Sequence, residues 1–371
     1  MGSVLCLRAA SLRNVVFAAI ALLSMLHGSA SLGKADSSTS ADDASITEAI
    51  ALADATSREA DIGDVQAGDA TPVRPVDGIW LVDTRHLPYC DVGCEQTHAF
   101  DYEQYESDAC DWIHADRQSF KATDRQTTRT IVYVHGNRVG PCEVRRRGLL
   151  VYESLIAQAD EDQEDLRFVI FSWPATQVRG PLRDVRLKAA RSDPAAYYLA
   201  RLLEQIDPEV KVSLVGYSFG ARVITGSLHL LGGGELGGLV IDDAAPDARN
   251  PMCVVMMASA MGDDWLEPNG YHGLALSQVD QMLLLNNRCD PVMKRYHHVG
   301  AFGSPSALGH CGVSSISAIG AAADKIRQID VGHDIGRSHD SMLYLGSPTL
   351  MGPTWQFLNC GAFGQPNVVE R

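Results

Sequence analysis

The chain has 371 residues, of which 46% are hydrophobic and 21% are charged, so it is long enough and apolar enough to bury a large core. Its formal net charge is −15 at pH 7. A surface of that sign repels phosphate backbones, which argues against nucleic acid as a partner.

The first 30 residues have the pattern of a secretory signal peptide. Arg8 and Arg13 precede an apolar run over 15–26, and small residues follow it. The run is short for a membrane span and its flanks are those of a cleaved leader. We predict a signal peptide over 1–30, with an uncleaved N-terminal anchor as the alternative. The mature protein is then secreted or resides in the periplasm or cell envelope, without a stable transmembrane span.

Residues 31–77 form an acidic spacer rich in Ala, Asp and Ser. No aromatic residue occurs over 31–75, and such a composition buries too little apolar surface to offset the entropy of ordering. The one helix signal is a possible capping box at 45–48. We predict that this spacer is disordered or partly helical.

Residues 78–371 alternate between strand and helix patterns, which predicts one α/β domain. Apolar runs of strand length recur at 79–82, 131–134, 168–171, 212–215, 239–241, 282–285 and 326–331. Helix-like segments lie at 149–159, 194–206, 219–231 and 291–297. This alternation predicts a mostly parallel sheet covered by helices on both faces. Residues that follow the strands then gather at one edge of the sheet.

The most informative motif is Gly216-Tyr-Ser-Phe-Gly220, which fits G-x-S-x-G between an apolar strand and a helix. Glycine two residues either side of Ser218 permits a turn that larger residues would obstruct. Such a turn presents the serine hydroxyl at the top of the sheet. We predict Ser218 as a catalytic nucleophile.

A serine nucleophile needs a base and an orienting acid, and in this turn type they follow it in the order acid, then histidine. Asp290 ends the segment after the 282–285 run, and Asp247 is the alternative acid one strand earlier. Either aspartate also suits a helix N-cap. For the base we predict His339, in the segment after the last strand, with His333 as the alternative.

The oxyanion hole is expected to use two backbone N–H groups. One belongs to Phe219, directly after the nucleophile, and the other to Asn137, which follows His135-Gly136 at the end of the 131–134 strand. His135 is expected to orient this loop by a hydrogen bond. We do not expect a phosphatase or a metal-dependent hydrolase, because no cluster of metal ligands accompanies these residues.

A methionine-rich segment over 252–261 has two interpretations. Methionine side chains are flexible, so Met256 and Met257 could line an acyl pocket. The alternative is a buried helix packed on the sheet.

Eight cysteines remain once Cys6 leaves with the signal peptide. In an oxidising compartment this even number predicts up to four disulfides. The alternative is a zinc site at Cys90 and Cys94, with His86 and His98 nearby.

Several motifs together resemble the α/β-hydrolase superfamily, and within it a bacterial secreted esterase/lipase-like branch. The motifs are Val134-His-Gly-Asn137, Phe171-Ser-Trp-Pro174, Gly216-Tyr-Ser-Phe-Gly220, Ala244-Ala-Pro-Asp247 and Ser338-His-Asp340. The resemblance implies serine-dependent hydrolysis of an acyl bond without metal or organic cofactor. A secreted hydrolase of small-molecule or lipid carboxylic esters is the first function class. An inactive binding or surface-assembly protein of the same fold is the second, because fold alone does not establish activity.

Overall fold

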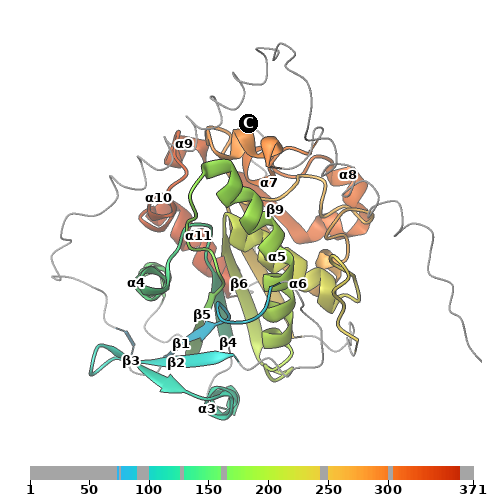
Figure 1. The fold of residues 1–371 in the computed structure, drawn as a ribbon. Helices are drawn as coiled ribbons and strands as arrows, with labels where there is room; N and C mark the ends of the chain where they lie inside the picture. The colour runs from blue at the N-terminus through green and yellow to red at the C-terminus, as the bar shows by residue number, and fades with distance from the viewer. Residues whose placement is uncertain are drawn as a thin grey trace, which may run out of the picture. The chain divides into compact units, whose positions relative to one another are not determined.

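One sheet of nine strands forms the centre of the protein in a computed structural model (Figure 1). The strands are β1 (Gly78–Asp83), β2 (Asp101–Glu106), β3 (Asp111–Ala115), β4 (Arg129–Val134), β5 (Leu166–Ser172), β6 (Lys211–Tyr217), β7 (Met252–Met257), β8 (Gln281–Asn286) and β9 (Ile326–Asp330). Their order across the sheet is β3-β2-β1-β5-β4-β6-β7-β8-β9. All neighbours from β1 to β9 are parallel, while β2 and β3 are antiparallel additions at one edge. The predicted fold class is confirmed.

The structure describes residues 73–74, 77–89, 100–125, 129–159, 165–242, 250–299 and 304–359. The chain divides into two units, 1–43 and 44–371, and all described residues belong to the second. The predicted signal peptide, nearly all of the acidic spacer and the alternative acid Asp247 lie outside the described residues. In the described part of the chain, no helix is both long enough and apolar enough to cross a membrane.

Helices cover both faces of the sheet, with α5 and α6 on one face and α4 and α11 on the other (Figure 1). The longer helices are α4 (Pro141–Ile156), α5 (Pro181–Leu203), α6 (Phe219–Leu231) and α11 (Pro348–Leu358). The short ones are α3 (Arg117–Ala122), α7 (Leu308–Cys311), α8 (Ile316–Ile319), α9 (Gly332–Ile335) and α10 (Ser341–Leu345), with 3-10 turns η1 (Thr123–Arg125), η2 (Ala275–Gln278), η3 (Met293–His298) and η4 (Gly320–Lys325).

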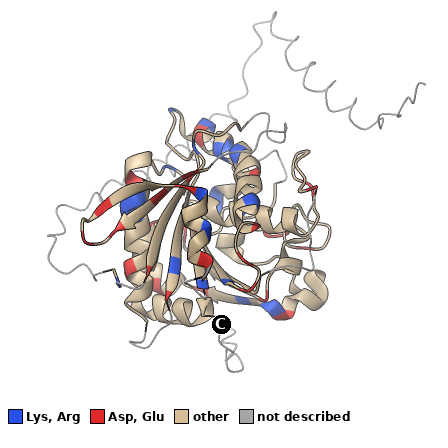
Figure 2. Ribbon diagram, turned by 90° about the horizontal axis from the view of Figure 1, so that it is seen from below, with Lys and Arg blue, Asp and Glu red and all other residues tan. Residues whose placement is uncertain are grey.

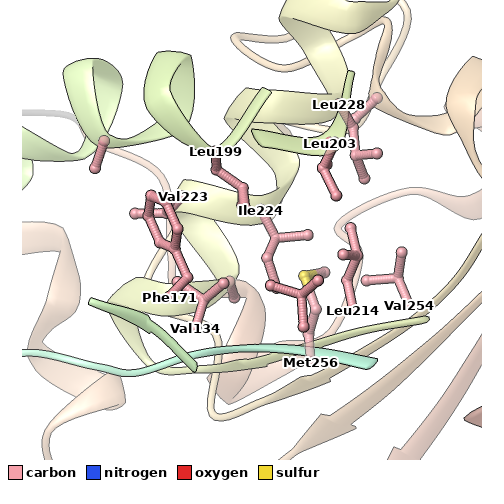
Figure 3. Close-up of a cluster of buried hydrophobic side chains, with 14 of the residues drawn as sticks. Val134, Phe171, Leu199, Leu203, Leu214, Val223, Ile224, Leu228, Val254 and Met256 are labelled. Carbon is pink, nitrogen blue, oxygen red and sulfur yellow. The ribbon is translucent and has the colours of Figure 1, made fainter. Parts of the chain in front are cut away.

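The strand side chains alternate between two hydrophobic cores, one under each helical layer. Figure 3 shows the core beneath α5 and α6, where strand residues meet helix residues such as Leu199, Val223 and Ile224. The next residue along each strand points into the other core, against α4 and α11. Because both faces are covered, the central strands are apolar throughout, as their sequences predict.

The seventh strand is not where the sequence pattern placed it. Residues 239–241 form no strand, and β7 is instead Met252–Met257. The expected strand is only three apolar residues long, whereas 252–257 is six consecutive apolar residues, the pattern of a strand buried on both faces. Met256 and Met257 are 0% and 3% exposed and belong to the two cores, which favours a packing role over the acyl-pocket interpretation. The buried-helix alternative is wrong in its element type.

Two helices begin earlier than predicted. Helix α4 begins at Pro141 and not at 149, and α5 begins at Pro181 and not at 194. Each starts with proline in its first turn, where the missing N–H costs no helical hydrogen bond. The expected helix over 291–297 is the 3-10 segment η3. Helix α6 matches its predicted bounds of 219–231.

The described cysteines depart from the expectation of complete pairing. Cys253 is disulfide-bonded, whereas four others are free thiols: Cys110, Cys142, Cys289 and Cys311. Cys110, Cys142 and Cys289 are exposed, and Cys311 is half-buried. The sequence allowed up to four disulfides, and these four cysteines are free thiols. Cys90 and Cys94, the basis of the zinc alternative, lie outside the described residues.

Candidate active site

Ser218 lies on a tight turn between the end of β6 and the start of α6. Its backbone has φ 51° and ψ −115°, a conformation that residues with a side chain rarely adopt. A side chain at Gly220 would collide with the Val134 carbonyl oxygen, and one at Gly216 would lie 2.9 Å from the Ala221 nitrogen. Glycine is therefore required on both sides for the turn to close as tightly as it does.

His339 lies between Ser218 and Asp290 and contacts both. Its Nε2 is 3.1 Å from Ser218 Oγ, and its Nδ1 is 2.6 Å from Asp290 Oδ2. Because a carboxylate only accepts hydrogen bonds, Nδ1–H donates to Asp290 and the Nε2 lone pair faces the serine hydroxyl. The aspartate side chain is fully buried and the histidine is 13% exposed. The arrangement can remove the proton from the hydroxyl of Ser218.

The two oxygens of Asp290 have different partners. Oδ2 accepts from His339, while Oδ1 accepts from the backbone N–H groups of Val292 and Met293, at 2.8 and 3.1 Å. Asp290 thus caps the turn that leads into η3 and orients the imidazole at the same time. The alternative base, His333, is an exposed residue of α9.

Two residues that the sequence analysis did not single out hold the loop that carries His339. The Tyr217 hydroxyl donates to the His339 carbonyl oxygen at 3.0 Å. Asn287 Nδ2 donates to the carbonyl oxygens of Gly336 and Ser338, at 2.9 and 3.3 Å. Burial raises the pKa of Tyr217 well above its ordinary value, so its hydroxyl stays a donor. The sequence signals available were the position of Tyr217 next to Ser218 and that of Asn287 three residues before Asp290.

The two predicted oxyanion donors are the backbone N–H groups of Phe219 and Asn137. Neither amide has a hydrogen-bond acceptor within the described residues. Phe219 is the first residue of α6, where helix N–H groups lack an intrahelical partner. A side chain at Gly136 would lie 3.1 Å from the Ser218 Cβ, so the Asn137 loop passes directly beside the serine. Both amides are available to a negatively charged oxygen.

His135 is a neutral residue that orients this loop. It is fully buried, and its pKa is lowered to about 3 by desolvation and by the positive charge of Arg85. Nδ1 lies 2.9 Å from the Gly136 carbonyl oxygen, and Nε2 lies 3.3 Å from both the Trp173 amide and Arg85 Nη2. Nδ1–H therefore donates to Gly136, while Nε2 accepts. His135 fixes the peptide that precedes the Asn137 N–H.

A buried charged pair on α5 holds the same loop from its other side. Asp184 and Lys188 are both 0% exposed and lie 2.9 Å apart. Asp184 also accepts from the side chain of Asn137 and from the backbone of Val178, each at 2.9 Å, and it pairs with Arg138. Burial alone would raise the pKa of Asp184, but these hydrogen bonds outweigh it and lower the pKa. Asp184 thus stays charged and ties the Asn137 loop to the helix.

Within the described ranges, no group of His, Cys, Asp and Glu side chains has the arrangement of a metal site. His86, a member of the zinc alternative, contacts Asp101 at 3.2 Å.

No protein-family model and no curated protein matches the chain. Solved structures resemble it at low identity. Esterase B from Lactobacillus rhamnosis is 14% identical, over 88% of this chain and 97% of that one, with a TM-score of 0.36. Acyl-protein thioesterase 2 from Zea mays is 14% identical over 63% and 94%, with a TM-score of 0.34. A bacterial heroin esterase is 13% identical over 93% and 97%, with a TM-score of 0.34.

At these identities and TM-scores the similarities say nothing about which bond the chain cleaves, so the fold is assigned from its own features. The sheet is parallel from β1 to β9, and Ser218 lies on a tight strand-to-helix turn. Asp290 follows β8 and His339 follows β9, in the order expected for this turn. The chain has the α/β-hydrolase fold.

Proposed function

We propose that the protein is a serine hydrolase that cleaves carboxylic ester bonds through an acyl-enzyme intermediate. One observation carries the proposal: Ser218, His339 and Asp290 form a continuous hydrogen-bonded chain beside two backbone amides that have no acceptor among the residues the structure describes. This combination supplies a nucleophile, a base, an orienting acid and an oxyanion hole at one place.

In the proposed acylation each atom of the site has a role. Ser218 Oγ attacks the ester carbonyl carbon as its proton passes to His339 Nε2. Asp290 stabilises the imidazolium that results, and the carbonyl oxygen becomes an oxyanion that accepts from the Phe219 and Asn137 N–H groups. The carbon–oxygen bond to the alcohol then breaks, and the imidazolium protonates the leaving alcohol.

Deacylation repeats these steps with water. His339 Nε2 removes a proton from a water molecule, whose oxygen attacks the acyl carbon. The bond to Ser218 Oγ breaks, the serine regains its proton from the imidazolium, and the carboxylic acid leaves. No metal or organic cofactor takes part in this proposal.

Carboxylic esters are the substrate class that we propose, either as small molecules or as lipids. A dehalogenase would need an aspartate where Ser218 stands. The pattern of residues 1–30 supports export, and in an exported enzyme coenzyme A thioesters are unsuitable substrates. We therefore propose a secreted or envelope location for the mature protein.

A fluorophosphonate probe tests the proposal directly, since it labels only an activated serine. The wild-type protein is expected to be labelled and to hydrolyse p-nitrophenyl esters, with rates that depend on acyl length. Ser218→Ala should lose labelling and about 10³-fold or more of the turnover while remaining folded. A folded wild-type protein that takes no label and cleaves no ester would instead be an inactive member of this fold with a binding role.

A further inference from the structure

A strongly basic face lies on the first half of α5, in a protein whose net charge is −15. Acidic and basic residues are both spread over the helices and strands (Figure 2). Residues 179–191 differ, because they contain five Lys or Arg and one Asp. Lys188 and Asp184 are buried together, so the remaining charges toward solvent are all positive.

The exposed arginines of this face are unpaired within the described part of the chain. Arg179, Arg183 and Arg186 are exposed, and none of them has an ion pair or hydrogen bond with another described residue. On α4, by contrast, Arg145 and Arg147 are each paired with a glutamate, at 2.6 Å. A cluster of like charges without counter-charges is destabilising by itself, which points to an anionic partner. We call Arg179, Arg183 and Arg186 the arginine face.

The arginine face borders the candidate active site. Arg183 precedes Asp184, whose carboxylate binds the side chain of Asn137. The loop that leads into α5 is bound to the same region, because the Arg138 amide donates to the Ala175 carbonyl oxygen at 2.8 Å. A partner held on this face would therefore lie beside the loop that carries the proposed oxyanion donor.

The residues between the arginines indicate what the partner is. Leu182 and Leu187 are only partly buried, so α5 presents apolar side chains among its positive charges. Arginines interspersed with leucine on a helix surface are typical of segments that lie on anionic membranes, where the charges meet lipid headgroups and the apolar side chains enter the interface. A soluble anion would use the arginines alone.

We infer that the arginine face docks the protein on an anionic lipid surface, next to its candidate active site. The inference concerns binding and is tested without turnover, so it can fail or succeed independently of the proposed hydrolysis. If both hold, the substrate is an ester carried by the membrane itself.

The test is co-sedimentation of the full chain with vesicles of phosphatidylcholine, with and without phosphatidylserine. The apolar segment over 15–26 can bind both kinds of vesicle, so the quantity compared is the ratio of the two affinities. Wild type and Ser218→Ala should both prefer anionic vesicles, and added salt should weaken that preference. In Arg183→Glu/Arg186→Glu the preference should fall by at least about 25-fold, since each basic residue near such a surface contributes about fivefold.

Lys121→Glu/Lys211→Glu is the charge-matched control. Both lysines are exposed. Lys121 lies on α3, before β4, and Lys211 is the first residue of β6, at the end of that strand opposite Ser218. This control should keep most of the preference. Arg183→Gln/Arg186→Gln provides a milder variant, and thermal unfolding checks that every variant is folded.

Three results would overturn the inference. Equal affinity of the wild type for both vesicle types is the first, and an equal loss in the lysine control is the second. The third is displacement by inorganic phosphate beyond that caused by chloride at the same ionic strength, which would indicate a soluble-anion site.

Discussion

Three side chains from three separate loops meet at the candidate site, and each has a second structural role. Ser218 has a left-handed φ of 51°, a conformation that costs of order 1–3 kcal/mol and that the flanking glycines make possible. Asp290 caps a turn with one oxygen while it orients His339 with the other. A substitution at one of these residues therefore changes activity without changing stability only when it keeps that residue's structural contact.

His339→Ala should reduce ester hydrolysis by about as much as Ser218→Ala, because nucleophile and base act as one unit. Asp290→Asn should reduce ester hydrolysis less than His339→Ala does. It should also keep the turn stable, because the amide oxygen can still cap it. Asp290→Ala should lose both activity and about 0.5–2 kcal/mol of stability through the missing cap. Steady-state kinetics and urea unfolding measure the two effects, with His333→Ala as the control that keeps wild-type activity. Full activity in His339→Ala would refute the assignment of the base.

Among the secondary-structure elements, the loops that follow β6, β8 and β9 bind one another at the carboxyl ends of the strands. The loop after β8 supplies Asp290 and also Asn287, which binds the loop carrying His339. Tyr217, the last residue of β6, binds that same loop from beside the nucleophile. The loop that carries His339 is thus held by hydrogen bonds from the end of β6 and from the loop after β8.

Tyr217→Phe tests this arrangement, because it keeps the ring and removes one hydrogen bond. The hydrogen bond from Tyr217 to the His339 carbonyl oxygen contributes about 0.5–1.5 kcal/mol to the position of the loop. Its loss should therefore lower kcat by about 2- to 13-fold and leave KM nearly unchanged. Tyr133→Phe is the matched control, since that hydroxyl is in the same core and has no hydrogen-bond partner among the described residues. A fall in kcat shared equally by both variants would show that Tyr217 has no positioning role.

Met256→Ala tests the assignment of β7 to the core. The side chain is fully buried against α6, so the substitution leaves a cavity and should cost about 2–5 kcal/mol of unfolding free energy. The preference for acyl length among p-nitrophenyl esters should not change. Leu343→Ala, at a site 46% exposed, is the control with little effect on stability. A changed acyl preference without loss of stability would place Met256 in a pocket.

At the scale of the whole molecule, burial of histidines makes stability depend on pH. Desolvation lowers the pKa of His135 to about 3 and that of His272 well below its ordinary value, with Arg85 and Arg222 adding repulsion. An unfolded chain binds a proton at each histidine near pH 6.5, while the folded protein does not. Stability is therefore full above about pH 6.5 and falls as the pH drops toward the folded pKa values.

Each of these histidines should contribute a slope of about 1.4 kcal/mol per pH unit to the unfolding free energy below pH 6. Urea unfolding at a series of pH values measures the slope. His272→Gln should remove the contribution of one proton, about 1.4 kcal/mol per pH unit, from this slope. His333→Gln, at an exposed site, should leave the slope unchanged. An unaltered slope in His272→Gln would mean that this residue is protonated in the folded protein.

Features that depend on residues close together in the chain can be predicted from the amino-acid sequence. The turn at Ser218, the bounds of α6 and the strands β1, β4, β5, β6 and β8 follow from short apolar runs and glycine spacing, and the order of acid and base follows from the turn type. A buried parallel strand has to be apolar throughout, which makes it visible in one dimension.

Features that rest on partners far apart in the chain become visible once the protein is folded. The first half of α5 looks too charged to pack, yet Lys188 is buried because Asp184 neutralises it and Asn137 completes the hydrogen bonds. The contacts of Asn287 could not be predicted locally, because its acceptors lie about 50 residues away in the chain. The strand at 252–257 could not be told from a helix or pocket lining until β6 and β8 paired with it. Burial and hydrogen bonding between distant segments set these outcomes.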